Sequence, residues 1–407
     1  MKKLKTKSPS NRSKLGILLA LFLLAALFFW RFSTYEGPVC EGDAKFTATL
    51  LEESKVYDNW QYFDIEGYNI KAPSELKISY GDKLQIAGEV KKGRLTDPEV
   101  KVVGGSKLHK ILFLIRSNLK SRIFEYLSEP QASLLAGVTL GAKEDLPKDF
   151  YESLRKTGTV HVVVVSGYNI SVVAGLMIGL SRFIRRQLAI VLALLAITFY
   201  TLLVGADPPA VRAAVMGSLA FTAVFLGRQR FSLYSLLLAA AIMSLVRPLV
   251  LADIGFQLSF LATAGIILFR ERILNSLKFL PKAFNDDLST TLAAQSLVVP
   301  VIFYHFGSVS AISPVANAIV LWTIPLATIA GFIFLAASYV IPFVATIISW
   351  VIWAILTFFV ILVEASSKIS FTQLTFTPKE ILPLIIYYSL LGGLIIYFKY
   401  VRVVKTK

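Results

Sequence analysis

Cysteine and histidine are scarce in this sequence. Its 407 residues include one cysteine, Cys40, and three histidines, His109, His161 and His305. A single cysteine excludes a disulfide within the monomer and a cysteine-rich metal site. Three histidines spread along the chain argue against the histidine-rich zinc centre of a hydrolase. These two absences argue against a metal site. Nothing else in the sequence implies a catalytic residue or a cofactor, so we do not expect an enzyme.

Charged residues are also few, whereas apolar residues are abundant. Charged side chains make up 17% of the chain and hydrophobic ones 55%, with a mean hydropathy of +0.65. A chain this apolar is not a soluble protein, and we interpret it as a polytopic membrane protein. The net charge of +16 invites a nucleic-acid partner. Most of the excess lies beside predicted spans, where the positive-inside bias alone would place it, so charge does not indicate DNA.

The chain begins with a basic stretch, residues 1–14, followed by an apolar run, residues 15–32. This run could be a signal peptide or an uncleaved anchor. It ends at Trp30 without a small-residue cleavage site, and the residue before Cys40 does not suit a lipoprotein signal, so we interpret it as a transmembrane anchor. The basic residues before it place the N-terminus in the cytoplasm and the next segment outside.

Short alternating runs with turn signals between them characterise residues 38–106. They predict a small, five-stranded, OB-like β-barrel on the outer side of the membrane. Its aromatic residues include Tyr57, Trp60, Tyr62 and Phe63. Such rings stack on single-stranded bases in some OB-folds, but they could equally form the barrel core. We favour the core for most of them, because acidic residues outnumber basic ones in this segment.

Residues 107–128 have apolar side chains at helical spacing, with lysines and arginines mostly at other positions. This pattern predicts an amphipathic helix that lies in the membrane interface. Its basic face could contact a phosphate backbone, but an interfacial helix explains the pattern without DNA.

Residues 130–398 contain nine predicted spans, which with the anchor make about ten. The predicted spans are residues 160–181, 188–204, 210–227, 231–246, 250–269, 287–306, 313–338, 342–365 and 381–398. Basic residues fall in the loops that this count assigns to the cytoplasm, including the tail 399–407. The predicted fold is thus a polytopic α-helical membrane protein with an extracytoplasmic β domain and both termini in the cytoplasm.

Residues 158–180 read GTVHVVVVSGYNISVVAGLMIGL, an apolar stretch that contains several polar side chains. In lipid such a segment must be mostly helical, because its backbone has no water to bond. Ser166 and Gly167 form the weak point, since glycine lowers helix propensity and serine competes for backbone hydrogen bonds. We expect a kinked or interrupted helix there. An interruption can line a cavity, although a tight helix crossing would also explain the two residues.

Polar side chains within predicted spans are costly and are usually functional or paired. Five lie near the outer ends of different predicted spans: His161, Arg212, Asp253, His305 and Asn317. Three lie deeper: Asn169, Gln257 and Gln295. Together with Ser166 and Gly167 they are candidates to line a channel with an outer vestibule and an amide-lined constriction. Near-surface charges can instead snorkel to the interface, which suits Arg212 but not the short side chain of Asp253.

Arg212 and Asp253 fall on different predicted spans at similar depth. Arg212 could pair with Asp253 or bind a phosphate. We favour the pair, because an uncompensated aspartate at that depth would be costly and would repel DNA.

Several stretches resemble the ComEC-type competence family, integral membrane proteins that pass transforming DNA through the bacterial cytoplasmic membrane. They are TGTVHVVVVSGYNISVVAG, GADPPAVRAAVM, ADIGFQLSFLATAGIILF and AAQSLVVPVIFYHFGSVSAISPVANAIVLWTIPLA, with weaker support from GDKLQIAGEV in the β domain. In order and spacing the resemblance covers about residues 130–326. Asn169 stands where the family pattern has a second histidine, which removes a titratable group.

The resemblance implies a channel for single-stranded DNA that works with a DNA receptor outside and an ATP-driven translocase in the cytoplasm. Many family members carry a C-terminal domain resembling metallo-β-lactamases. The chain ends at Lys407 without one, so we expect either that a separate nuclease degrades the other strand or that the duplex is unwound differently. A small-solute transporter and a non-conducting scaffold of the uptake machine remain alternatives, and the motifs favour the channel.

Overall fold

The structure is a computed structural model. It describes residues 26–34, 42–50, 55–57, 60–65, 68–76, 78, 81–91, 94–142, 146–163, 167–179, 183–225, 232–369, 373–375, 385–391 and 393. The predicted anchor is described from residue 26 onward, where the chain is helical to residue 33. The tail 399–407, most of the predicted span 381–398 and the candidate Ser166 lie outside the described residues.

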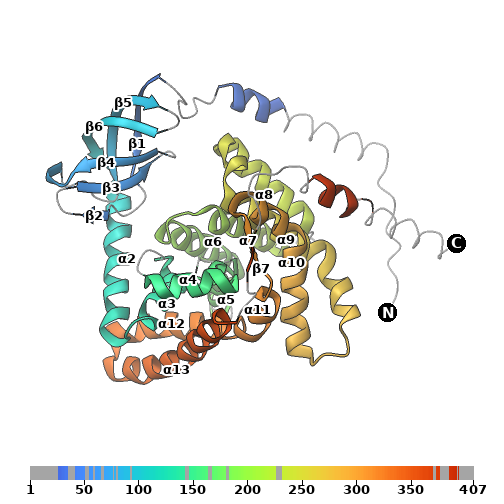
Figure 1. Cartoon of the computed structure of the whole chain (residues 1–407). Helices are drawn as coiled ribbons and strands as arrows, with labels where there is room; N and C mark the ends of the chain where they lie inside the picture. Colours follow the sequence, from blue (N-terminus) through green and yellow to red (C-terminus); the bar gives the residue numbers. More distant parts are fainter. Residues whose placement is uncertain are drawn as a thin grey trace.

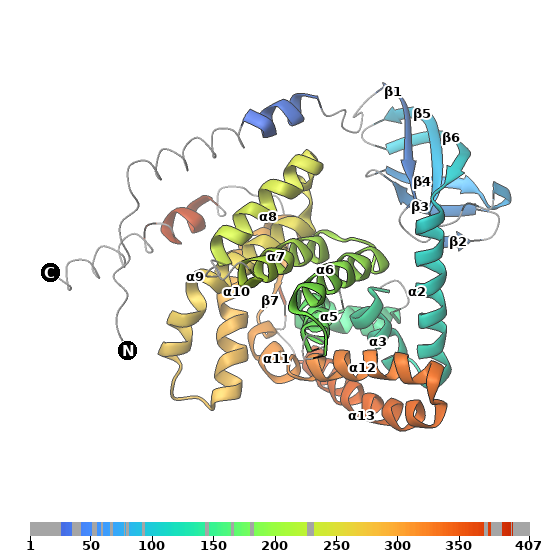
Figure 2. The ribbon, with the colours of Figure 1, turned by 180° about the vertical axis from the view of Figure 1, so that it is seen from behind.

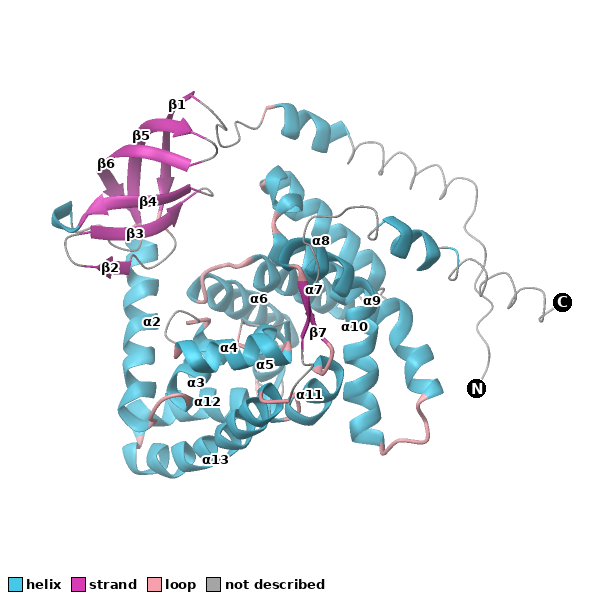
Figure 3. Cartoon of the chain, in the orientation of Figure 1, coloured by secondary structure: helices cyan, strands magenta, loops and turns pink. Residues whose placement is uncertain are grey.

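Two small antiparallel sheets form the β region (Figure 3). The strands are β1 (Gly42–Thr49), β2 (Lys55–Tyr57), β3 (Trp60–Ile65), β4 (Tyr68–Pro73), β5 (Asp82–Lys91) and β6 (Arg94–Gly105), with the 3-10 helix η1 (Ser74–Leu76) after β4. The described strands pair in the orders β1-β5-β6 and β2-β3-β4. The predicted second strand is in fact two, β2 and β3, which pair with Tyr57 opposite Trp60. The described part of the β region thus has six strands in two sheets, where the sequence predicts five strands in one barrel.

The core of the β region is formed by alternate residues of facing strands, such as Ile70, Leu84 and Ile86, as expected for sheets with one buried face. Phe63 joins this core, as predicted. Trp60 does not: 41% of it is exposed, and the ammonium group of Lys71 lies 4.0 Å from the centre of its ring. Trp60 is therefore not a core residue, and the prediction, which covered most of the four aromatic residues, stays open because the side chain of Tyr57 lies outside the described part.

The helix α2 (Lys107–Tyr126) leaves the β region directly. Ser106 caps its first turn by accepting the His109 N–H at 3.4 Å, and the Ser106 N–H donates to the Gly81 carbonyl at 2.9 Å. The ammonium group of Lys110 pairs with buried Asp82 at 2.7 Å. These contacts fix the base of α2 to the turn before β5.

Apolar side chains of α2 lie both inside the protein and on its surface. Leu108 and Ile111 are more than half exposed, whereas Arg116, one of the basic residues of the predicted amphipathic helix, is buried. Leu112 and Ile123 are buried as expected. The helix therefore presents apolar side chains outward, as a helix at a lipid surface does.

A helical body follows α2 (Figure 1). Its elements are α3 (Gln131–Leu140), α4 (Lys148–Thr157), η2 (Val160–Val162), α5 (Gly167–Gly179), α6 (Arg186–Leu203), α7 (Pro208–Phe225), α8 (Ser232–Val246), η4 (Pro248–Ala252), α9 (Ile254–Ser276), α10 (Lys282–Phe306), β7 (Ser308–Ser310), α11 (Ser313–Val320), α12 (Thr323–Val340), α13 (Pro342–Ser367) and β8 (Gln373–Thr375). The short strands β7 and β8 pair antiparallel. Figures 1 and 2 show α2 upright at one side, α12 and α13 along the lower edge, and the α9–α10 hairpin at the side away from α2.

Four helices in the described part of the chain are long and apolar enough to cross a membrane: Ile254–Ser276, Phe284–Phe306, Thr323–Val340 and Pro342–Ser367. Three apolar helices are shorter: Gln131–Leu140, Gln187–Leu203 and Ser232–Val246. The protein is thus mostly helical with four candidate membrane spans and a small antiparallel β region. The larger count of about ten stays a prediction from the sequence.

The predicted span 313–338 is not one helix. It forms α11 and α12, with Leu321 and Trp322 between them. Pro325 explains the interruption, because proline has no N–H to donate to the Leu321 carbonyl one turn earlier. That carbonyl instead accepts the Ile324 N–H at 3.2 Å.

Helix α3 lies at the centre of the largest apolar cluster, and all ten of its residues are buried. It packs against α2, α12 and α13. Gly331 of α12 allows a close approach, because an added Cβ there would lie 2.9 Å from side-chain atoms of Leu135 and Thr139. A helix buried on every side can be apolar all round, which explains why α3 has no polar face.

Candidate functional site

The stretch 158–180 is not a continuous helix in the described residues. Gly158 ends α4 in the left-handed conformation, with φ of 70°, and is followed by the 3-10 helix η2. Helix α5 begins at Gly167, the position at which the sequence predicts an interruption. His161 lies in η2 and is exposed.

Asn169, in the first turn of α5, is buried and points to the end of α3. Its Nδ2 donates to the Val138 carbonyl at 2.6 Å. The Tyr200 hydroxyl of α6 donates to the neighbouring Thr139 carbonyl at 2.8 Å. The last carbonyls of a helix lack intrahelical partners, so Asn169 and Tyr200 together cap α3. Tyr200 was not predicted as a site residue, because its partner is a backbone atom that no sequence pattern reveals.

Gln295 and Asn317 meet at Ser313. The Ser313 hydroxyl oxygen accepts Nε2 of Gln295 at 2.8 Å and Nδ2 of Asn317 at 3.1 Å. It also donates to the Gly158 carbonyl at 3.5 Å. This Ser313 cluster joins α10, α11 and the end of α4. Ser313 is not among the residues predicted from the sequence, although its position one helical turn before Asn317 is a usable signal.

Arg212 of α7 lies between α5 and α9. Its Nε donates to the Ser259 hydroxyl at 2.7 Å, and its Nη1 lies 3.6 Å from the Met216 sulfur. The guanidinium carbon is 5.9 Å from the centre of the Phe260 ring. A Cβ added at Gly167 would lie 3.9 Å from Nη2, so α5 begins beside this guanidinium.

Asp253 has a different partner from the one predicted. It is the N-cap of α9, and its Oδ1 accepts the Phe256 N–H at 2.7 Å. Among the described residues it forms no ion pair with Arg212, so the favoured Arg212–Asp253 pair is wrong. The physical reason is that unpaired N–H groups and the dipole at a helix start stabilise a carboxylate without a cation. Gln257, one turn further, donates to the Leu251 carbonyl at 3.0 Å.

His305 lies in the last turn of α10, with its ring edge-on to that of Tyr304 at 5.0 Å between centres. The structure thus brings Gln295 together with Asn317, and Gly167 together with Arg212. It places Asn169, Asp253 and His305 in separate surroundings, and a single channel lined by all the candidates stays a prediction.

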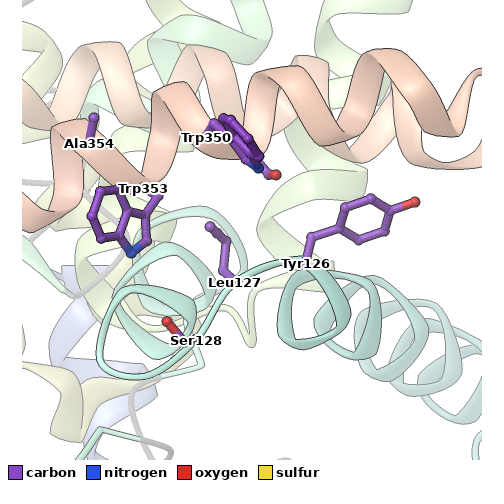
Figure 4. A pocket seen from close by; sticks show the side chains of 7 residues that line it. Tyr126, Leu127, Ser128, Trp350, Trp353 and Ala354 are labelled. Atoms are coloured by element: carbon purple, nitrogen blue, oxygen red, sulfur yellow. The ribbon is translucent and has the colours of Figure 1, made fainter.

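A cavity of about 570 Å³ lies between the end of α2 and α13. Figure 4 shows its lining by Tyr126, Trp350 and Trp353, and none of the candidate residues contributes to it. In the part of the chain that the structure describes, no group of three or more His, Cys, Asp or Glu side chains is arranged to hold a metal ion.

The four candidate spans and the polar side chains held within the helical body define an integral membrane protein. Residues 138–400 match the Competence protein family, and the chain belongs to this family. The resemblance seen in the sequence motifs is confirmed. The match includes Asn169, Arg212, Gln295 and Asn317.

Three relatives show how far the similarity extends. ComE operon protein 3 of Bacillus subtilis (strain 168) is 28% identical over 211 residues, 51% of this chain and 26% of that protein. The uncharacterized protein YcaI of Escherichia coli (strain K12) is 27% identical over 211 residues, 49% of this chain and 28% of that protein. An uncharacterized protein of Aquifex aeolicus (strain VF5) is 33% identical over 128 residues, 31% of this chain and 30% of that protein. The similarity therefore spans less than a third of each relative's length, and no solved structure matches this chain significantly.

Proposed function

We propose that this protein is a channel that imports single-stranded transforming DNA across the bacterial cytoplasmic membrane. The observation that carries the proposal is the family match over residues 138–400, which includes every element from α4 to α13. The four candidate spans support a membrane role for this part of the chain.

The chemistry of the polar groups supports passage rather than storage of a strand. The Ser313 cluster and Asn169 are neutral, and their donors are used within the protein, so they present no tight site for a phosphate. A strand that moves must leave each contact easily, so weak and repeated contacts suit a channel better than one tight site. We therefore assign this chain no catalytic step.

The proposed arrangement has both termini in the cytoplasm and the β region outside. It is supported by the basic residues in alternate loops. In this arrangement a receptor outside delivers the DNA, and an ATP-driven translocase in the cytoplasm pulls the strand.

Deleting the gene in a naturally transformable host tests the proposal. Transformation should be abolished while labelled DNA still binds the cell surface, because binding precedes membrane passage. Transformants at the wild-type frequency would contradict it. The Gln295→Met variant separates a channel from a scaffold: at normal membrane abundance a channel should import less DNA, whereas a scaffold should be unaffected.

A further inference from the structure

Arg270 provides an internal comparison for Arg212. Its Nε donates to the Thr290 hydroxyl at 2.8 Å, just as Nε of Arg212 donates to the Ser259 hydroxyl at 2.7 Å. The terminal nitrogen of Arg270 then reaches a carboxylate, Asp286 Oδ1, at 2.9 Å. The anion completes a charge-assisted pair on a neighbouring helix.

Arg212 lacks such an anion among the described residues. The only contact of its terminal nitrogens within hydrogen-bonding range there is the Met216 sulfur at 3.6 Å, and a thioether is a weak acceptor. The Ser259 hydroxyl accepts from Nε, and its own proton has no acceptor in the described part of the chain. The terminal nitrogens of Arg212 and the adjacent Ser259 hydroxyl therefore have no strong acceptor among the described residues.

The helices around Arg212 also supply no counter-charge. Helix α7 packs mainly on α5, α6, α8 and α9. In their described residues the only acid is Glu271, 12 positions beyond Ser259 on α9, or about 18 Å along the helix. Asp253 caps α9, and Asp207 has an interaction of its own. A half-buried guanidinium without a counter-charge is costly in a membrane protein.

The start of α5 adds a second positive element. A Cβ at Gly167, its first residue, would lie 3.3 Å from the Ala213 Cβ and 3.9 Å from Arg212 Nη2. The N-terminus of a helix carries unpaired N–H groups and a partial positive charge. Placed beside a guanidinium, it increases the need for an anion at this point.

We propose that Arg212, Ser259 and the first turn of α5 form a binding site for a phosphodiester group, occupied in function by the backbone of the passing DNA strand. A guanidinium presents two parallel donors that match two phosphate oxygens, and the Ser259 hydroxyl supplies a third. The identity of the occupant rests on the function proposed above, because a phospholipid headgroup carries the same chemical group.

The test uses the full-length protein in nanodiscs of phosphatidylcholine, which has no net charge. Binding of a fluorescent single-stranded oligothymidine is measured by anisotropy over a range of salt concentrations. The slope of log affinity against log salt should be shallower by about 0.7 in Arg212→Met for one lost phosphate contact. Arg270→Met is the matched control: it removes the same charge from a guanidinium that already has a carboxylate, and should keep the wild-type slope.

Further variants keep the result clear. Arg212→Lys retains the charge but not the paired donors, so it should keep most of the slope with weaker binding. If Arg212→Met does not assemble, Arg212→Lys takes its place in the comparison with wild type. An affinity of Arg212→Lys for the oligothymidine equal to that of wild type would then overturn the proposed site. A strand with neutral methylphosphonate linkages should bind wild-type protein and Arg212→Met equally.

Three results would overturn the inference. One is a wild-type slope in Arg212→Met, and another is an equal loss of slope in Arg212→Met and Arg270→Met. The third would identify a phospholipid headgroup as the occupant. In that case phosphatidylglycerol raises the thermal midpoint of wild type but not of Arg212→Met, while the two proteins bind the strand equally. Each leaves the proposed channel intact, since that proposal is tested separately, by transformation of the deletion strain and by DNA import in Gln295→Met.

Discussion

At the scale of single residues, the buried amides and the charged side chains have different tasks. Asn169 satisfies a backbone carbonyl at the end of α3, and Asp253 satisfies a backbone N–H at the start of α9. Both contacts close helix ends that would otherwise leave polar groups unpaired. Arg212 differs, because its contacts leave a charge uncompensated among the described residues.

Replacing Asn169 should therefore destabilise the helical body. Asn169→Leu removes the donor to the Val138 carbonyl and leaves that acceptor buried, which should lower the free energy of unfolding by about 1–3 kcal/mol. Asn169→His keeps a donor and should cost less. Thermal unfolding of the purified protein in detergent measures the difference.

Asn275→Leu is the control for this experiment. Asn275 is exposed, and its Nδ2 bonds only the Glu271 carbonyl within its own helix at 2.7 Å. Its replacement should change the unfolding midpoint little. If Asn169→Leu were as stable as Asn275→Leu, the cap on α3 would have no energetic role.

At the scale of helices, the hairpin of α9 and α10 depends on close backbone approach. The α9–α10 hairpin is held by the Arg270–Asp286 pair near its tip and by Gly265 near its middle. A Cβ added at Gly265 would overlap the Ala293 carbonyl oxygen, so only glycine allows α10 to lie this near.

Gly265→Ala should separate these two helices. The obstructing atom belongs to the backbone of α10 and cannot rotate away, so the variant should lose about 1–3 kcal/mol of stability despite the better helix propensity of alanine. Gly175→Ala in α5 is the matched control, because a Cβ there meets nothing within 4 Å. Membrane abundance and thermal midpoints of the two variants would decide, and equal values would contradict the close packing.

The sequence predicted helices better than it predicted their contacts. Periodicity located α2 and α13 within a few residues, and the Ser-Gly pair located the start of α5 at Gly167. Hydropathy alone predicts one span over α11 and α12, because it does not register that Pro325 cannot donate to the Leu321 carbonyl. A proline three residues into a helix marks its start, and this rule would have separated them.

The hydrogen-bond partners of the polar residues could not be predicted from the sequence. Asn169 bonds a carbonyl 31 positions away and Gln295 bonds a serine 18 positions away, and such pairs depend on how helices cross. The similar predicted depths of Arg212 and Asp253 in the membrane suggest an ion pair between them. In the structure Asp253 instead caps its own helix, because it accepts the N–H of Phe256 only three residues away.

At the scale of the whole molecule, the orientation in the membrane can be tested with the native cysteine. Cys40 lies outside the described residues, between the predicted anchor and the β region. If the N-terminus is cytoplasmic, a membrane-impermeant maleimide should label Cys40 in intact cells. Labelling only after the membrane is permeabilised would reverse the orientation, and a Cys40→Ser variant controls for other reactive groups.

The junction between the β region and α2 has a mechanical consequence. The Lys110–Asp82 pair and the Ser106–Gly81 hydrogen bond clamp the two into one stiff unit, and α2 is about 30 Å long. A rotation of the β region by about 10° would therefore move the far end of α2 by about 5 Å, roughly one helical turn. At that end Tyr126 packs edge-on against Phe334 of α12, with 5.3 Å between ring centres. A force applied to the β region would thus be delivered as torque to the helices that surround α3.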